Sequence, residues 1–136
     1  MDSCLSCYFQ LFAGFMGFAN ELADCGRFYA DYERIMAHWH ATLDLPILDL
    51  PYEEMVADQE GTTRRLMEFL GLPFRDESLR FHEINRPTLT ASSQQVRQPI
   101  YRRSVARWKR YERHLGPLRT ALGRYAPADE ASPPAV

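Results

Sequence analysis

Residues 46–50, with the sequence PILDL, form a short apolar run that lies between Pro46 and Pro51. The run is too short for a helix and has the composition of a buried β-strand. A single strand is not stable alone, because its backbone N–H and C=O groups need a neighbouring strand. No second strand can be recognised in the sequence. The run therefore predicts either an unrecognised partner strand in this chain or partner strands outside it.

The remainder of the chain has helical patterns. Apolar residues recur three and four positions apart over residues 5–22, which predicts a helix that begins almost at residue 1. A second helix is predicted from about residue 27 to residue 43, and we expect its apolar stripe to pack into the core. The stripe consists of Phe28, Tyr32, Ile35, Met36, Trp39 and Leu43. His38 and His40 are two positions apart and do not share a helix face, which argues against a metal pair.

Shorter helical segments follow the apolar run. The sequence predicts a helix over residues 59–70, with Leu66, Phe69 and Leu70 inward and Gly71 as its stop. Gly61 and the two threonines after it are interpreted as the first turn of this helix rather than as a phosphate loop. Further helical segments are predicted at 52–57, 76–83 and 103–115, the last ended by Gly116 and Pro117, with a final turn at 118–125. The fold class predicted for this chain is mostly α with one short strand.

Size and composition are those of one globular domain. The chain has 136 residues, of which 46% are hydrophobic and 25% are charged. We place the domain at residues 1–125 and interpret the Ala- and Pro-rich residues 126–136 as a flexible tail. No apolar run has the length of a membrane span, and the early apolar stretch has no basic segment before it. The sequence therefore predicts a cytoplasmic protein with no membrane partner.

The three cysteines are an odd set, which argues against a secreted disulfide framework and favours buried thiols. Cys4 and Cys7 form a C-x-x-C pair, but no second Cys or Cys/His pair follows at the spacing of a zinc site. No metal is predicted.

Charge is divided along the chain. From Arg86 to Arg124 there are ten Lys/Arg residues and one acidic residue, whereas the residues before Arg86 include six basic and fifteen acidic ones. Such clustered positive charge favours an anionic partner. The alternative is an exposed, Arg-rich helix face that Trp108 and Leu115 anchor in the core. The irregular residues 85–101 add hydroxyl and amide groups, and Arg97 adds a planar donor fork suited to phosphate.

Four motifs in order resemble the C-terminal half of the sulfotransferase family. They are LPYEEMV at 50–56, FLGLP at 69–73, TASSQQVRQPIY at 90–101 and SVARW at 104–108. The resemblance extends from Leu5 to about Leu122. It is strongest to bacterial sulfotransferases that follow tetratricopeptide repeats, and more distant to the animal tyrosylprotein sulfotransferases.

The resemblance implies a C-terminal fragment of an α/β P-loop-like fold, with residues 46–50 as a parallel strand. It implies a sulfuryl donor, 3′-phosphoadenosine 5′-phosphosulfate, and an acceptor hydroxyl, of which a protein tyrosine is one kind. It also implies that the phosphosulfate loop and the acceptor base lie upstream of Met1. The catalytic residues are therefore unassigned, and we expect the isolated chain to be inactive. A homodimer is left open.

The resemblance also assigns residues to the nucleotide donor. Ser6 matches the serine that holds the 3′-phosphate, and Tyr52 matches the tyrosine that lines the nucleotide site. Arg107 stands where the tyrosylprotein enzymes have a lysine that contacts phosphate. The loop that wraps the nucleotide contributes Ser92, Ser93, Gln95, Arg97 and Gln98. Gln98 is a departure, because the tyrosylprotein enzymes carry lysine there.

A second hypothesis is a helical interaction module whose basic helix docks an acidic partner. Nucleic acid is disfavoured as that partner, because the formal net charge is −2 and most aromatic residues lie in apolar stripes.

Overall fold

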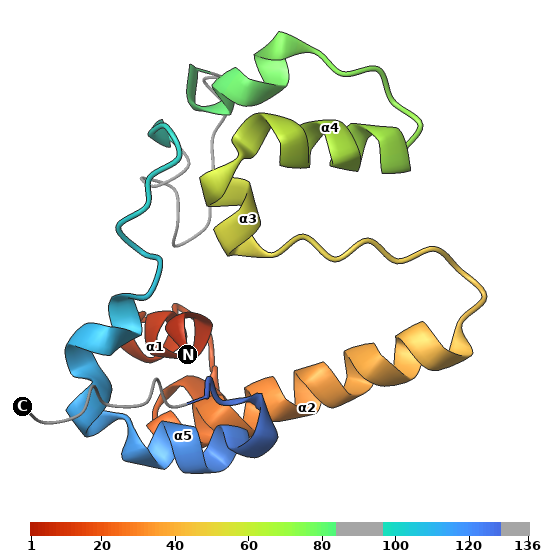
Figure 1. Cartoon of the computed structure of the whole chain (residues 1–136). Coiled ribbons are helices and arrows are strands. Elements are labelled where there is room, and N and C mark those ends of the chain that lie inside the picture. Colours follow the sequence, from red (N-terminus) through yellow and green to blue (C-terminus); the bar gives the residue numbers. More distant parts are fainter. Residues whose placement is uncertain (84–96, 129–136) are drawn as a thin grey trace, which may run out of the picture. The chain divides into compact units, whose positions relative to one another are not determined.

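The computed structural model describes residues 1–83 and 97–128 (Figure 1). Within those residues the regular structure is helical and contains no β-strand. The chain divides into two compact units, which are described separately. Unit 1 consists of Met1–Leu43 and the chain from Ala106 onward, and unit 2 consists of Asp44–Val105.

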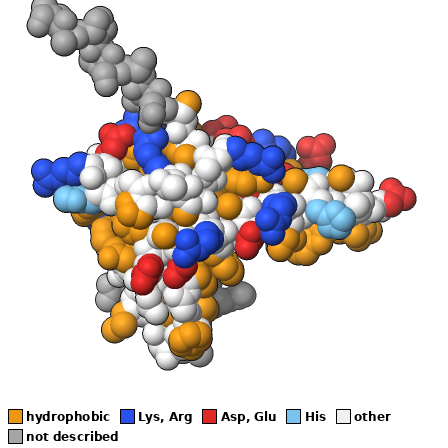
Figure 2. Space-filling model, turned by 90° about the horizontal axis from the view of Figure 1, so that it is seen from below, with side chains coloured by type: hydrophobic (Ala, Val, Ile, Leu, Met, Phe, Trp, Pro, Cys, Tyr) orange, Lys and Arg blue, Asp and Glu red, His pale blue; other side chains and the backbone are white. Residues whose placement is uncertain are grey.

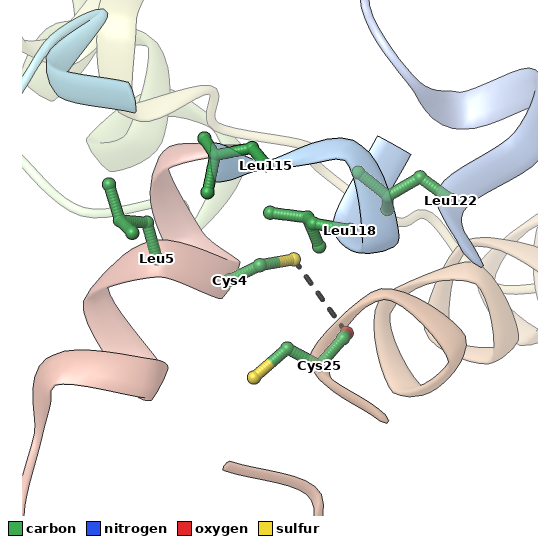
Figure 3. Packing of buried hydrophobic residues seen from close by; sticks show 6 residues of the cluster. All are labelled: Cys4, Leu5, Cys25, Leu115, Leu118 and Leu122. Carbon is green, nitrogen blue, oxygen red and sulfur yellow. Dashed lines mark hydrogen bonds between the residues drawn. The ribbon is translucent and has the colours of Figure 1, made fainter. Parts of the chain in front are cut away.

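Unit 1 is a small helical assembly around one apolar cluster. Its α-helices are α1 (Asp2–Phe9), α2 (Leu22–Thr42) and α5 (Gly116–Leu122), and its 3₁₀ turns are η1 (Gly17–Ala19), η4 (Arg107–His114) and η5 (Gly123–Tyr125). The three α-helices and the residue directly before α5 contribute the buried side chains shown in Figure 3, which are Cys4, Leu5, Cys25, Leu115, Leu118 and Leu122. Leu115 immediately precedes α5 and is buried, as the alternative of an anchored basic helix predicts. The core therefore joins the first and last parts of the chain.

Gly26 permits the close approach of α2 and α5. A Cβ atom at this position would lie 2.7 Å from Cβ of Ala121 and 3.0 Å from the carbonyl oxygen of Leu118. Real Cβ atoms do not approach neighbouring atoms so closely, so a larger residue here would push the helices apart.

The predicted helix over residues 5–22 is wrong beyond Phe9. The helix ends there, and the chain forms only a 3₁₀ turn, η1, before α2 begins. Two glycines, Gly14 and Gly17, weaken a helix in this stretch. Phe15 is 96% exposed, while the ring of Phe18 stacks on that of Phe28 at 4.0 Å. The apolar periodicity of the local sequence does not indicate this tertiary contact.

The predicted second helix is confirmed as α2, although it begins at Leu22 rather than near residue 27. The expectation that its apolar stripe packs into the core is wrong. Phe28, Tyr32, Ile35, Trp39 and Leu43 are all exposed. The side chains that α2 buries are near its start, at Cys25 and Gly26, where α1 and α5 pack against it.

Unit 2 contains α3 (Tyr52–Ala57), α4 (Gln59–Phe69) and the 3₁₀ segment η2 (Asp76–Glu83), which confirms three predicted helical segments. Asp58 caps α4, since its Oδ1 accepts a hydrogen bond of 2.9 Å from the backbone N–H of Gly61. The interpretation of Gly61 as part of a helical first turn is therefore confirmed. Gly71 follows α4 with a φ of +65°, as expected for the residue that ends a helix.

Two details of unit 2 differ from the sequence prediction. Phe69 and Leu70 are exposed rather than inward, and the buried residues of α4 are Thr62 and Thr63. Residues 46–50 form no strand, because no described residue makes a backbone hydrogen bond with them. The short parallel strand is thus not present in this structure.

The basic helix predicted from residue 103 begins later, as η4 at Arg107, and is a 3₁₀ helix. Residues 102–106 form turns, and Ala106 has a left-handed backbone conformation with φ of +55°. A non-glycine residue in this conformation cannot continue a right-handed helix. Gly116 and Pro117 open α5, with the proline in its first turn.

Among the described residues, the structure has no helix whose length and apolar character would let it cross a bilayer.

Candidate functional site

Most arginines of the acidic segment are paired with carboxylates, whereas most of those in the basic segment are not. In the acidic segment, Arg27, Arg34, Arg64 and Arg65 each form an ion pair, and Arg75 and Arg80 form none with a described residue. In the basic segment, seven arginines form no ion pair with a described residue: Arg97, Arg102, Arg103, Arg107, Arg110, Arg113 and Arg124. We call these seven residues the unneutralised arginines. All seven are exposed, so their positive charge is available to an anion.

In unit 2, Tyr52 lies beside the chain that follows residue 96. Its hydroxyl donates a long hydrogen bond, 3.5 Å, to the carbonyl oxygen of Tyr101. At the other end of α3, Nη2 of Arg102 donates to the carbonyl oxygen of Ala57 at 3.3 Å. These two hydrogen bonds hold residues 101–102 against α3. Tyr52, which is predicted to contact the nucleotide, therefore lies next to the end of the segment that carries Arg97 and Gln98.

Arg97 and Gln98 are exposed and belong to unit 2. Neither makes a hydrogen bond or an ion pair with another described residue. Three other predicted nucleotide residues, Ser92, Ser93 and Gln95, lie outside the described residues.

In unit 1, Arg107 opens η4 directly after the left-handed residue Ala106. Its guanidinium carbon lies 5.2 Å from the centre of the Phe9 ring, within range of a cation–π contact. The next residue is held by α1, because the backbone N–H of Trp108 donates to Oδ1 of Asp2 at 2.7 Å. Ser6 is exposed on the same helix. Ser6 and Arg107 are both predicted to contact the nucleotide, and they lie on two elements, α1 and η4, that pack together.

Trp108 anchors η4 to the body of unit 1. The side chain packs against the apolar cluster, and the guanidinium of Arg119 lies 5.3 Å from the ring centre. Arg119 also pairs with Glu112 at 2.9 Å. Trp108 therefore contacts a guanidinium and the core, as the alternative of an anchored basic helix predicts.

The sequence reasoning missed two residues that shape this region, Asp2 and Ala106. The carboxylate of Asp2 meets a backbone group 106 positions away, and no local pattern encodes such a contact. The left-handed conformation of Ala106 could not be predicted from the sequence either, because alanine rarely adopts it.

The cysteines are free thiols, as predicted, and Cys4 and Cys25 are buried. Cys4 Sγ lies 3.7 Å from the carbonyl oxygen of Cys25 (Figure 3), and Cys25 Sγ donates to the carbonyl oxygen of Phe18 at 3.2 Å. Burial raises the pKa of all three thiols, and raises that of Cys25 to about 11 with a further contribution from the nearby Cys4. The protonated form is therefore favoured, which suits packing rather than nucleophilic chemistry. The described residues contain no group of His, Cys, Asp or Glu side chains that could hold a metal.

Comparison with known proteins gives the class of this chain. The profile of the Sulfotransferase family matches residues 1–76, which is more than half of the sequence. The chain therefore belongs to the sulfotransferase family.

Two relatives extend this finding. The chain is 41% identical over 121 residues to an uncharacterised protein of Aquifex aeolicus, a match that covers 87% of this chain and 16% of the relative. It is 33% identical over 57 residues to cytosolic sulfotransferase 3 of Arabidopsis thaliana, which covers 40% of this chain and 18% of the relative. The chain thus spans less than a fifth of the length of these relatives. No solved structure is significantly similar to it.

Proposed function

We propose that this chain is the part of a sulfotransferase that holds the nucleotide of the sulfuryl donor, 3′-phosphoadenosine 5′-phosphosulfate. Family membership supports sulfuryl transfer in general. The observation that carries the proposal further is the set of unneutralised arginines, because the donor bears phosphate and sulfate groups that match exposed guanidinium groups.

Each unit carries residues that the resemblance assigns to the donor, and the two sets are taken separately. In unit 1, Ser6 on α1 holds the 3′-phosphate, and Arg107 at the start of η4 contacts phosphate. Tyr52 and the segment through Arg97 and Gln98 line the rest of the nucleotide. The finer assignments of Ser92, Ser93 and Gln95 stay predictions from the sequence.

The reaction moves a sulfuryl group from the donor to an acceptor hydroxyl. The bond from the acceptor oxygen to sulfur forms, the bond from sulfur to the 5′-phosphate oxygen breaks, and adenosine 3′,5′-bisphosphate leaves. The hydroxyl proton must pass to a base. We assign no base within this chain, and expect that base and the phosphosulfate loop to come from the remainder of a sulfotransferase domain. A protein tyrosine is one acceptor that the family resemblance includes.

The test compares the isolated chain with a chimera. The chimera is the Aquifex relative in which this chain replaces its matching 121-residue segment. Both proteins are incubated with donor labelled with ³⁵S and a panel of hydroxyl acceptors that includes tyrosine peptides and sugars. We expect transfer only by the chimera. Robust transfer by the isolated chain would contradict the proposal that it lacks part of the catalytic machinery.

A second candidate function is the docking of an acidic partner by η4, which the exposed Arg107, Arg110 and Arg113 support. A generic polyanion such as heparin would then bind the isolated chain with strong salt dependence and without competition from adenosine 3′,5′-bisphosphate. If that nucleotide competes with heparin at fixed salt, the result favours nucleotide binding by a sulfotransferase instead.

A further inference from the structure

The last residue of α1, Phe9, supports the guanidinium of Arg107. The guanidinium carbon lies 5.2 Å from the centre of the Phe9 ring, in the range of a cation–π contact. The Phe9 ring is held in turn by the ring of Tyr111, which it meets edge to face at a centroid distance of 5.2 Å. Arg107 and Tyr111 both belong to η4. One aromatic ring of α1 therefore contacts two side chains of η4.

Both partners of this cation–π contact are open to solvent. Phe9 is 47% exposed, and Arg107 is exposed and unneutralised. Figure 2 shows hydrophobic side chains and Lys and Arg side chains exposed on the same face of the molecule. Arg107 makes no ion pair or hydrogen bond through its side chain with another described residue. The Phe9 ring is therefore the contact that restrains the guanidinium, and the N–H groups of Arg107 remain available to phosphate.

Phe9 shares one face of α1 with Asp2 and Ser6. The three residues are spaced four and three positions apart, which places them in one row along the helix. At one end of the row, Asp2 accepts the hydrogen bond of 2.7 Å from the backbone N–H of Trp108. At the other end, Phe9 lies beside Arg107. Ser6 is between these two contacts with η4, so the ring holds Arg107 on the face that carries Ser6.

An arginine that is restrained before its ligand arrives binds an anion at lower entropic cost. The side chain of arginine has many rotamers, and fixing them on binding reduces affinity. A ring that already holds the guanidinium lowers this cost. We propose that Phe9 is a positioning residue for the donor nucleotide, because its ring holds Arg107 in the orientation in which the arginine contacts phosphate. The proposal rests on the proposed function, which assigns Ser6 and Arg107 to the donor.

A double-mutant cycle tests this role, with adenosine 3′,5′-bisphosphate titrated by calorimetry into the chimera. Phe9→Leu removes the ring and retains an apolar side chain. We expect it to raise the Kd about two- to fivefold, the effect of losing one exposed cation–π contact. In the Arg107→Gln background, Phe9→Leu should raise the Kd no further, because the ring then has no guanidinium to hold.

Two single variants separate positioning from general packing. Phe9→Tyr keeps an aromatic ring beside the guanidinium and should keep the Kd close to that of the unmodified chimera. Phe15→Leu is the matched control, because it removes a ring that is 96% exposed and lies in the chain that follows α1. It should leave the Kd unchanged.

Nuclear magnetic resonance of the isolated chain measures the contact without any nucleotide. The ring current of an aromatic side chain shifts the signals of protons held over the ring upfield. The side-chain signals of Arg107 should therefore move downfield in Phe9→Leu and stay upfield in Phe9→Tyr. The signals of Arg110, which has no printed counterpart ring in α1, should not respond to either substitution.

Two results overturn the inference. One is a Kd that Phe9→Leu leaves unchanged, or that rises further when Phe9→Leu is added to Arg107→Gln, since the ring would then not act through Arg107. The other is an Arg107 signal that does not respond to Phe9→Leu, which would show that the contact is not formed in solution.

The cycle also separates this inference from the proposed function. If Arg107→Gln raises the Kd and Phe9→Leu does not, the positioning role alone is overturned. A chimera that binds no nucleotide, or that is unaffected by Arg107→Gln, contradicts the proposed function, while the signals of Arg107 still report whether Phe9 holds its side chain.

Discussion

The carboxylate of Asp2 accepts a hydrogen bond from the backbone N–H of Trp108 at 2.7 Å, and so joins two residues that are 106 positions apart. Asp2 is the first residue of α1, and Trp108 is the second residue of η4. The bond holds the start of η4 next to α1, the helix that carries Ser6. Arg107 directly precedes Trp108 in the chain. The position of Arg107, which is predicted to contact the nucleotide, therefore depends on a contact with the N-terminal helix.

Asp2→Ala should lower the free energy of unfolding by about 1 kcal/mol, because it leaves the half-buried N–H of Trp108 without its acceptor. Urea unfolding followed by circular dichroism measures the change. Asp2→Asn retains an acceptor oxygen and should cost less. Ser3→Ala, at an exposed neighbouring position, is the control for changes in α1 itself. Equal stability of Asp2→Ala and Ser3→Ala would show that the hydrogen bond does not contribute.

Gly26→Ala should destabilise the fold by about 1–3 kcal/mol, because the added methyl group would overlap Ala121 on α5. Gly14→Ala is the matched control, since no atom lies within 4 Å of its Cβ position. Thermal unfolding compares the two variants. A Gly26→Ala protein as stable as Gly14→Ala would contradict the close packing of α2 and α5.

Ala106→Gly should preserve or raise stability, by up to about 1 kcal/mol, because glycine adopts a φ of +55° without the steric cost that alanine has. The same substitution at Ala37, an exposed residue inside α2, should lower stability by about 1 kcal/mol. Chemical denaturation measures the change in the free energy of unfolding, and we expect this change to have opposite signs for the two substitutions. Destabilisation by both substitutions would show that Ala106 is not in the left-handed conformation.

The buried thiol of Cys25 predicts a loss of stability at alkaline pH. Its pKa rises on folding from 9.0 to about 11, so the folded state binds the proton more tightly than the unfolded state does. This contribution to stability is fully present below pH 9.0 and is lost as the pH rises to about 11. The free energy of unfolding, measured in urea at several pH values, should fall across this window, and Cys25→Ser should reduce the slope. An unchanged slope in Cys25→Ser would contradict the pKa shift.

The helices of unit 2 could be predicted from sequence because their signals are local. Asp58 caps α4 through the N–H of Gly61, and Gly71 ends it with a positive φ. Both residue types have these roles at these positions in many helices. By contrast, the apolar period of residues 5–22 continues past Phe9, where the helix stops. The stacking of Phe18 on Phe28 across η1 and α2 decides the path of the chain there.

Periodicity also identified the apolar residues of α2 as one face of the helix, but it could not show that this face is exposed. The same limit applies to residues 46–50, whose composition indicates a strand although the strand requires a neighbour. For the candidate site, the resemblance supplied the residues, and only the structure showed that Tyr52 contacts the carbonyl of Tyr101. The contact between Asp2 and Trp108 depends on the tertiary fold and has no sequence signal.

The titration of adenosine 3′,5′-bisphosphate into the chimera tests whether this chain holds the nucleotide of the donor. Isothermal calorimetry at fixed salt compares the unmodified chimera with its Arg107→Gln and Arg110→Gln variants. Both substitutions remove one positive charge from η4, and only Arg107 lies at a position assigned to phosphate. We expect Arg107→Gln to raise the Kd about tenfold, equivalent to about 1.4 kcal/mol, and Arg110→Gln to have a much smaller effect. Equal effects of the two substitutions would contradict this expectation, because the arginines would then supply only a general positive field.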